Sequence, residues 1–266
     1  MSDLFDTPWR RMAAAIFERP RDGRVFGMMD IDVTDAMAWM RERNAAGARL
    51  TPTHLVTTAF AHAIAFDCPQ LNCVIRFGRV YPREDVGCRL PIDRDGQDLG
   101  SVLIRQLEGK TITQVAEEMN EKVEVARVRN EDPAMENRNG LASLPWPLRK
   151  WVYDAVRWLV HEVGVPVGSF RPGMFGSFMV TNVGPLGLTV GYPALMPASD
   201  VPFVVAMGKI TRKPMAIDEQ VVIRDVIPIC ATFDHRVIDG SGVAKLAKGV
   251  LRRLANPSMM DVLPTS

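Results

Sequence analysis

The sequence contains little that would place the protein in a membrane or on nucleic acid. No run of about 18 apolar residues occurs, and residues 1–11 lack the apolar core of a signal peptide. The 32 Lys and Arg nearly cancel the 31 Asp and Glu, so no broad positive field is available to hold nucleic acid or an anionic membrane. We therefore expect a cytoplasmic protein, without nucleic-acid or membrane contact, whose specificity comes from a local site.

Cysteine is also scarce. The four cysteines form no Cys-x-x-Cys pair and have no paired histidines beside them, which argues against a metal site and against a disulfide framework. We expect buried, reduced thiols at all four positions and no bound metal. They are Cys68, Cys73, Cys88 and Cys230.

Helical and strand-like segments are mixed throughout the 266 residues, 47% of which are hydrophobic. Apolar spacing and capping residues predict helices over 9–19, 36–44, 51–66, 111–129, 145–163 and 241–254. Alternation and β-branched residues predict strands over 25–33, 73–80, 85–92, 99–107, 177–181, 201–210 and 220–233, the last broken at Pro228. The polar segment 130–139 is expected to be a loop. The simplest architecture is a single α/β domain over 1–266, with a sheet exposed on one side.

The stretch 232–242 lies between the last predicted strand and the closing helix, and it carries candidate chemistry. Strand-to-helix junctions expose side chains where ligands can reach them. His235 could move a proton near neutral pH, Asp239 could orient the loop, and Gly240 permits a tight turn. The residues alone leave other interpretations open: Asp239 or Ser241 could cap the helix, and an isolated histidine can be purely structural.

The eight residues Phe-Asp-His-Arg-Val-Ile-Asp-Gly, 233–240, resemble the signature of the catalytic domain of 2-oxo acid dehydrogenase dihydrolipoyl acyltransferases. Chloramphenicol acetyltransferase shares the fold and a shorter motif. Residues 177–187 are similar to the family's strand that ends in a hydroxyl residue, Asn or Ser, and a glycine turn. Residues 51–72 resemble its helix and Pro-x-Leu-Asn turn, and Arg10-Arg11 its first helix. The resemblance covers nearly the whole chain except about 130–172, and it implies a two-layer sandwich in which helices cover a mixed β-sheet.

This resemblance implies a role for each matching residue. His235 removes the proton from an attacking thiol, and Thr181 donates a hydrogen bond to the tetrahedral oxyanion. Asp239 is implied to fix the motif loop through an ion pair with Arg10, which matches better than Arg11 beside it. Gly240 supports the turn, and Asn182 holds either the loop or the ligand. Thr181 could instead be an ordinary strand residue, Asn182 a plain turn residue, and the arginines solvated surface charges.

The family also implies substrates and an assembly. A coenzyme A thioester is the expected co-substrate, no cofactor is bound, and a lipoyl group is possible if another chain supplies it. The expected assembly is a homotrimer, or a larger assembly of trimers, with each site at a subunit boundary. The competing hypothesis is a trimeric scaffold related to the cores of 2-oxo acid dehydrogenase complexes that has lost activity. The intact His235, Thr181 and Asp239 favour the enzyme.

The chain departs from the family pattern in three respects. Homology to the core begins within the first ten residues, so we expect a free-standing core without a lipoyl domain. The family's Asn-Pro-Pro-Gln stretch is changed at 195–199, which bears on acceptor specificity. The helix 145–163 has an apolar stripe that includes Trp151 and Trp158, and lies in a family-atypical insertion at about 130–172. Because such a stripe is usually core, we favour packing on its own domain over a lid or a membrane-surface helix.

Overall fold

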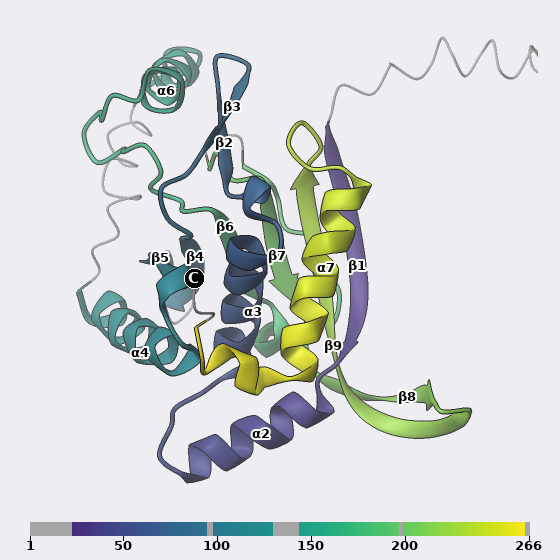
Figure 1. Ribbon diagram of the computed structural model, residues 1–266. Helices are drawn as coiled ribbons and strands as arrows, with labels where there is room; N and C mark the ends of the chain where they lie inside the picture. Colours follow the sequence, from purple (N-terminus) through teal and green to yellow (C-terminus); the bar gives the residue numbers. More distant parts are fainter. Residues whose placement is uncertain (1–22, 95–97, 130–143, 197–198, 264–266) are drawn as a thin grey trace, which may run out of the picture.

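The computed structural model describes residues 23–94, 98–129, 144–196 and 199–263, which fold around a mixed β-sheet (Figure 1). Seven strands form this sheet in the order β1-β9-β7-β6-β4-β5, with β8 pairing with the outer part of β9. β6 runs parallel to both β4 and β7, whereas the other pairs are antiparallel. The strands are β1 (Arg24–Asp32), β4 (Cys88–Arg94), β5 (Asp98–Ile104), β6 (Phe178–Asn182), β7 (Phe203–Met207), β8 (Thr211–Ile217) and β9 (Gln220–Asp234).

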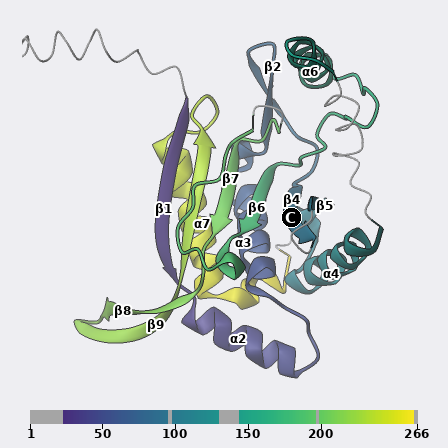
Figure 2. The same ribbon diagram turned by 180° about the vertical axis from the view of Figure 1, so that it is seen from behind.

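Helices α3 (Pro52–Phe66) and α7 (Gly240–Ala255) lie together over one face of the sheet (Figure 1). Within the described residues no α-helix covers the opposite face, which Figure 2 presents from behind. α2 (Thr34–Ala45) lies beside the lower ends of these elements, and α4 (Ile112–Arg129) packs on β5 and α3. The predicted two-layer α/β class is confirmed. Whether 1–266 form a single domain stays a prediction.

α3 is the central helix of the covering layer because its sequence is apolar on nearly every side. Thr51 caps its N-terminus by accepting a hydrogen bond from the His54 backbone, and the His54 ring accepts one from the Thr51 backbone. Pro52 stands in the first turn, where its missing N–H costs nothing. Phe60 of this helix packs against the stacked rings of Phe178 and Phe203 from the sheet, whose centroids are 5.6 Å apart. This contact joins the two layers at their centre.

Most predicted elements are present, with differences in three strands. The segment predicted as one strand over 73–80 folds back on itself as a hairpin of β2 (Cys73–Arg76) and β3 (Arg79–Pro82). The turn between them uses Phe77 and Gly78, both at positive φ. β8 was not predicted, because Lys213 and Pro214 break its apolar alternation.

The predicted break at Pro228 is wrong, since β9 runs without interruption from Gln220 to Asp234. The carbonyl of Pro228 accepts a hydrogen bond from the Gly208 backbone, just past the end of β7. β7 pairs with β9 only as far as Ile229, and β8 begins to pair at Val226. Pro228 therefore faces the gap between two partner strands, where a missing N–H removes no ladder hydrogen bond.

The segment predicted to be an insertion, at about 130–172, also differs from expectation. Its helix, α6 (Leu148–Trp158), begins three residues later than predicted and continues as a single π-helical turn, η4 (Leu159–Val163). No residue of α6 is buried, so the prediction that its tryptophan stripe packs on its own domain is wrong for the chain taken alone. The predicted helix 9–19 and loop 130–139 lie outside the described residues.

The expectation of buried thiols is confirmed. All four cysteines are free and buried, and burial raises the pKa of Cys68 to about 11 and that of Cys88 further still. No helix among the described residues is long and apolar enough to cross a membrane. The remaining short helical turns are η2 (Pro69–Leu71), η3 (Leu107–Gly109), η5 (Gly184–Leu186) and η6 (Pro257–Met260).

Candidate active site

His235 occupies the turn that joins β9 to α7. Its backbone N–H donates to the Gly23 carbonyl at 2.8 Å, and the N–H of Asp234 donates to Pro202 at 2.8 Å. The turn closes with the N–H groups of Val237 and Ile238 both donating to the carbonyl of Asp234. Ile238 is buried, whereas the side chain of His235 is exposed. The backbone of the motif is thus fixed while the imidazole stays accessible.

Asp239 is the N-cap of α7. Its carboxylate accepts hydrogen bonds from the Gly242 N–H at 2.7 Å and from the Ser241 hydroxyl at 2.9 Å. The bond from the Gly242 backbone is the main reason why the pKa of Asp239 lies below its ordinary value. Of the interpretations left open by the sequence, the helix cap is the one that these contacts of Asp239 confirm. Its implied partner Arg10 lies outside the described residues, so their ion pair stays a prediction.

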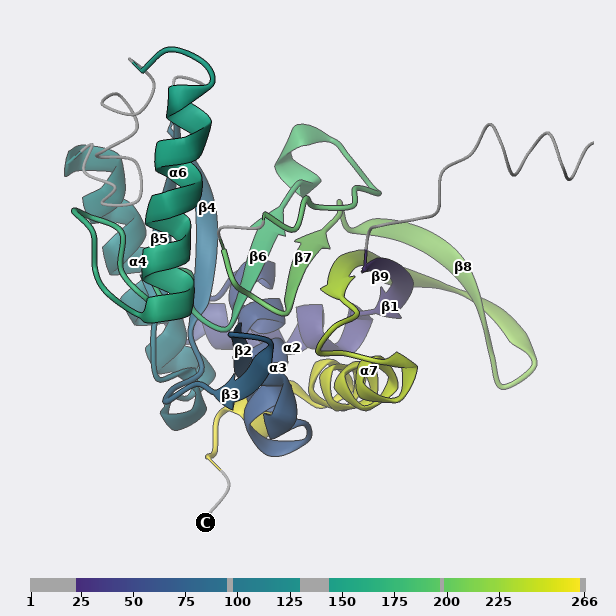
Figure 3. The same cartoon turned by 90° about the horizontal axis from the view of Figure 1, so that it is seen from above.

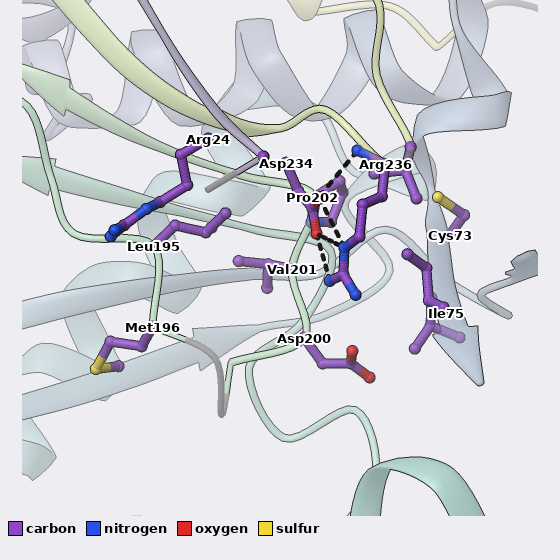
Figure 4. A pocket seen from close by; sticks show the side chains of 13 residues that line it. Arg24, Cys73, Ile75, Leu195, Met196, Asp200, Val201, Pro202, Asp234 and Arg236 are labelled. Carbon is purple, nitrogen blue, oxygen red and sulfur yellow. Dashed lines mark hydrogen bonds and ion pairs between the residues drawn. The ribbon is translucent and has the colours of Figure 1, made fainter. Parts of the chain in front are cut away.

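A cavity of about 570 Å³ opens beside the motif (Figure 4). The residues on either side of His235, namely Asp234 and Arg236, line it together with Val237. Figure 4 shows Arg236 against Asp234 and directed towards Asp200, while Leu195 and Met196 stand on another side. The remaining wall includes Gly23, Arg24, Cys73, Val74, Ile75, Val201 and Pro202. The motif thus borders a space large enough for a substrate.

Arg236 and Asp234 form a two-point ion pair that sequence reasoning missed. The guanidinium donates to the Asp234 carboxylate from Nε at 3.0 Å and from a terminal nitrogen at 2.6 Å. These hydrogen bonds raise the pKa of Arg236. The signal was present, because both residues flank His235 in the motif. By contrast, Arg83 donates a hydrogen bond to the carbonyl of Asp200, a residue of the cavity wall. Because the two residues lie far apart in the sequence, no local pattern predicts this contact.

Thr181 and Asn182 end β6, next to the first turn of α3. The side-chain amide of Asn182 donates to the Thr53 hydroxyl at 3.1 Å, and its carbonyl oxygen accepts from the Gly184 N–H at 3.0 Å. Asn182 therefore ties the glycine turn to α3. Thr181 is half-buried and pairs with Ala206 of β7.

The fold does not bring Thr181 and His235 together within one chain. Thr181 pairs in register with Ala206 of β7, and Ala206 pairs in register with Cys230 of β9. His235 follows five residues further along the chain from Cys230, which corresponds to roughly 15 Å along the strand, and two strand spacings add about 10 Å sideways. Neither side chain can span this separation, so one chain alone does not assemble the two residues around one reacting atom.

Comparison with known proteins places this site in a family context. Residues 174–262 match the model of the 2-oxoacid dehydrogenases acyltransferase (catalytic domain) family. The dihydrolipoyllysine-residue acetyltransferase component of the pyruvate dehydrogenase complex of Acholeplasma laidlawii is 31% identical over 85 residues, 32% of this chain and 15% of that protein. The dihydrolipoyllysine-residue succinyltransferase component of the 2-oxoglutarate dehydrogenase complex of Pseudomonas aeruginosa is 30% identical over 89 residues, 33% of this chain and 21% of that protein. The matches thus span about a fifth or less of these relatives.

Solved structures share the fold at low sequence identity. A probable dihydrolipoamide acetyltransferase from Listeria monocytogenes superposes with a TM-score of 0.64 at 19% identity, covering 98% of this chain and 96% of that one. Chloramphenicol acetyltransferase superposes with a TM-score of 0.53 at 13% identity, covering 94% and 96%. The resemblance read from the sequence is confirmed: residues 174–262 match the catalytic-domain model of the 2-oxoacid dehydrogenases acyltransferase family, and nearly the whole chain shares the fold of the solved structures.

Proposed function

We propose that the protein transfers an acyl group from a coenzyme A thioester to an acceptor thiol. The observation that carries this proposal is the exposed His235 on a rigid turn, beside a cavity lined by its neighbours in the motif. His235 accepts the proton of the acceptor thiol, and the thiolate attacks the thioester carbonyl. The tetrahedral oxyanion accepts a hydrogen bond from the Thr181 hydroxyl. When the intermediate collapses, coenzyme A leaves as a thiolate and takes the proton back from the imidazolium.

This mechanism requires Thr181 from a second copy of the chain. The separation of Thr181 from His235 within one chain supports a site at a subunit boundary, and we propose a trimer with such boundaries. The sheet face that no described α-helix covers is a suitable contact surface, because Phe26 and Met28 of β1 are exposed on it. Phe26 also contacts the ring of Tyr192, at a centroid distance of 5.5 Å, in the loop that follows Thr181.

The acceptor is expected to contact the stretch after the glycine turn. Leu195 and Met196 line the cavity, and these positions belong to the segment in which the sequence departs from the family's Asn-Pro-Pro-Gln. We propose that this change makes dihydrolipoamide a poor acceptor and admits another thiol, while coenzyme A thioesters remain the donors. A panel of acceptors measured with a series of short acyl-CoA donors tests this specificity.

The proposed function is tested by acyl exchange between labelled acyl-CoA and free thiols. The wild-type protein should catalyse the exchange, and His235→Ala should reduce the rate by about 100-fold or more, because it removes the general base. The variant should keep its thermal midpoint, since the side chain is exposed. A variant that retains more than about a tenth of the wild-type rate would disprove the mechanism. A wild-type protein without exchange activity would favour the inactive scaffold.

A further inference from the structure

The outward side of α6 carries an apolar surface that the described chain leaves uncovered. Trp151 and Trp158 are 66% and 52% exposed, and Leu148 and Leu159 are exposed with them. Trp151 follows Leu148 by three residues, and Trp158 and Leu159 follow Trp151 by seven and eight, which places these four side chains on one side of the helix. Trp146, which is 69% exposed, stands just before the first turn. We call these five residues the tryptophan face. It contains three of the five tryptophans in the chain.

The β2–β3 hairpin extends the tryptophan face. Phe77 at its tip is 63% exposed and meets the ring of Trp158 edge-on, at a centroid distance of 6.4 Å and an interplanar angle of 82°. The Phe77 backbone N–H donates to the Glu162 carboxylate, which ties the tip to the insertion. Val80 and Tyr81 of the same hairpin are also exposed. Figures 1 and 3 show the helix and the hairpin at the same end of the molecule.

A different side of the insertion holds it to the body. Val160 of η4 is buried, and η4 packs against β2. His161 lies 3.4 Å from the carboxylate of Asp200 on the wall of the cavity beside the motif. The orientation of α6 is therefore set by its inner side, which leaves the tryptophan face pointing away from the body.

The charges on α6 are mainly positive. The helix carries Arg149, Lys150 and Arg157 against a single acid, Asp154, so its formal charge is +3 − 1 = +2. The one carboxylate already accepts a hydrogen bond from Lys150 at 2.5 Å. At 100° per residue these cations lie on the polar side of the helix, turned away from the tryptophan face, and the net charge of +2 favours an anionic surface over a neutral one.

We propose that the tryptophan face and the hairpin tip bind the surface of a lipid bilayer that contains anionic headgroups. Indole rings are most stable at the boundary between water and hydrocarbon, where the ring is buried and its N–H stays hydrated. A short helix with such rings on one side and cations on its polar side lies flat in that boundary. Eleven residues extend about 16 Å, much less than the roughly 30 Å of a bilayer core, so α6 rests on the surface. This proposal reverses the expectation drawn from the sequence.

The test is co-sedimentation of the full chain with vesicles of phosphatidylcholine alone and of phosphatidylcholine with about 30% phosphatidylglycerol. The wild-type protein should bind both and prefer the anionic vesicles, and added salt should weaken that preference. Trp151→Ser combined with Trp158→Ser should lower the partition coefficient by about tenfold or more. Arg157→Glu should lower binding to the anionic vesicles by about fivefold and leave binding to phosphatidylcholine unchanged.

The matched control removes two exposed apolar side chains elsewhere. Val221→Ser with Ile223→Ser lies on the β8–β9 arm and should bind vesicles as the wild type does. Quenching of wild-type tryptophan fluorescence by brominated lipids provides a readout that needs no variant. Absence of wild-type binding, or equal binding by the tryptophan variant, would overturn the proposal. So would a smaller oligomer in the tryptophan variant without vesicle binding by the wild type, because a second copy would then cover the face.

Discussion

α6 and α7 are both amphipathic helices, but only α7 buries its apolar side within the described chain. α7 follows the His235 motif and buries Leu246, Val250 and Leu254 against the covering layer. At Gly249 it approaches α3 so closely that an added Cβ would lie 3.0 Å from that of Ala63. α6 buries no residue and points its tryptophans outward. An apolar stripe thus predicts that a helix has a face to cover, but not what covers it.

The two helices also begin differently. The carboxylate of Asp239 caps α7, so the helix starts within the motif. α6 has no side-chain cap, and Pro147 precedes its first turn. The capped and packed helix lies within residues 174–262, which match the family model, whereas α6 lies outside them. The part of the chain that matches the family model thus includes a helix packed on the protein's own core, whereas α6 has no such support.

The largest effect on stability is expected from truncating the packed helix. Leu246→Ala should lower the free energy of unfolding by about 2–5 kcal/mol, because Leu246 is fully enclosed and its loss leaves a cavity. Leu148→Ala in α6 is the matched control and should change it by less than about 0.5 kcal/mol. Denaturant unfolding of both variants checks the contrast. Equal losses would mean that α6 packs as tightly as α7.

A smaller effect should appear on acidification. Burial lowers the pKa of His54 in α3 to about 4, so the folded protein keeps this ring neutral where the unfolded chain protonates it. The unfolded state then binds more protons between about pH 6.5 and pH 4, and stability falls as the pH drops through that window. The loss should reach about 2 kcal/mol at pH 5. Burial also lowers the pKa of His62, so its titration should add to the loss of stability on acidification.

His54→Gln isolates that contribution, because glutamine can keep the capping-box contact without titrating. Its free energy of unfolding should depend less on pH than that of the wild type between pH 7 and pH 5. Parallel pH profiles for the two proteins would show that His54 is protonated equally in the folded and unfolded states.

The smallest effect concerns the cap of α7. Asp239→Ala should lower the thermal midpoint by about 2–4 °C, because it leaves the Gly242 N–H without its partner. Asp239→Asn should preserve the midpoint if capping is the main role, since asparagine caps as well as aspartate does. A clear drop for Asp239→Asn would indicate the ion pair with Arg10 that the family resemblance implies. Scanning calorimetry of both variants distinguishes the two roles.

The sequence predicted the fold well where local signals and packing agree. The apolar spacing of α3 and of α7 and the motif around His235 all identified elements that the structure contains. It failed where a long-range arrangement decided the outcome. Pro228 reads locally as a strand break, but the partners of β9 leave a gap at that position. The tryptophans of α6 were predicted to lie in the core, because their spacing in the sequence carries no information about the surface next to the helix.

The candidate site was predicted only in its local parts. His235, Asp239 and Gly240 lie together because they are adjacent in sequence, and Asn182 follows Thr181 into its turn. The distance between Thr181 and His235 depends on strand order and register, which no local pattern encodes. Their implied meeting across a subunit boundary therefore needs a direct test.

That test is acyl exchange by mixed subunits of two inactive variants, His235→Ala and Thr181→Ala. Loss of the hydroxyl donor should cost about 3 kcal/mol of transition-state stabilisation, so each variant alone should be nearly inactive. If each site takes its histidine from one chain and its threonine from the next, a mixture at equal concentrations should regain about a quarter of the wild-type rate after exchange of subunits. A mixture of His235→Ala with the double variant should regain none. No recovery in the first mixture, once mass spectrometry has established that the subunits have exchanged, would contradict the shared site.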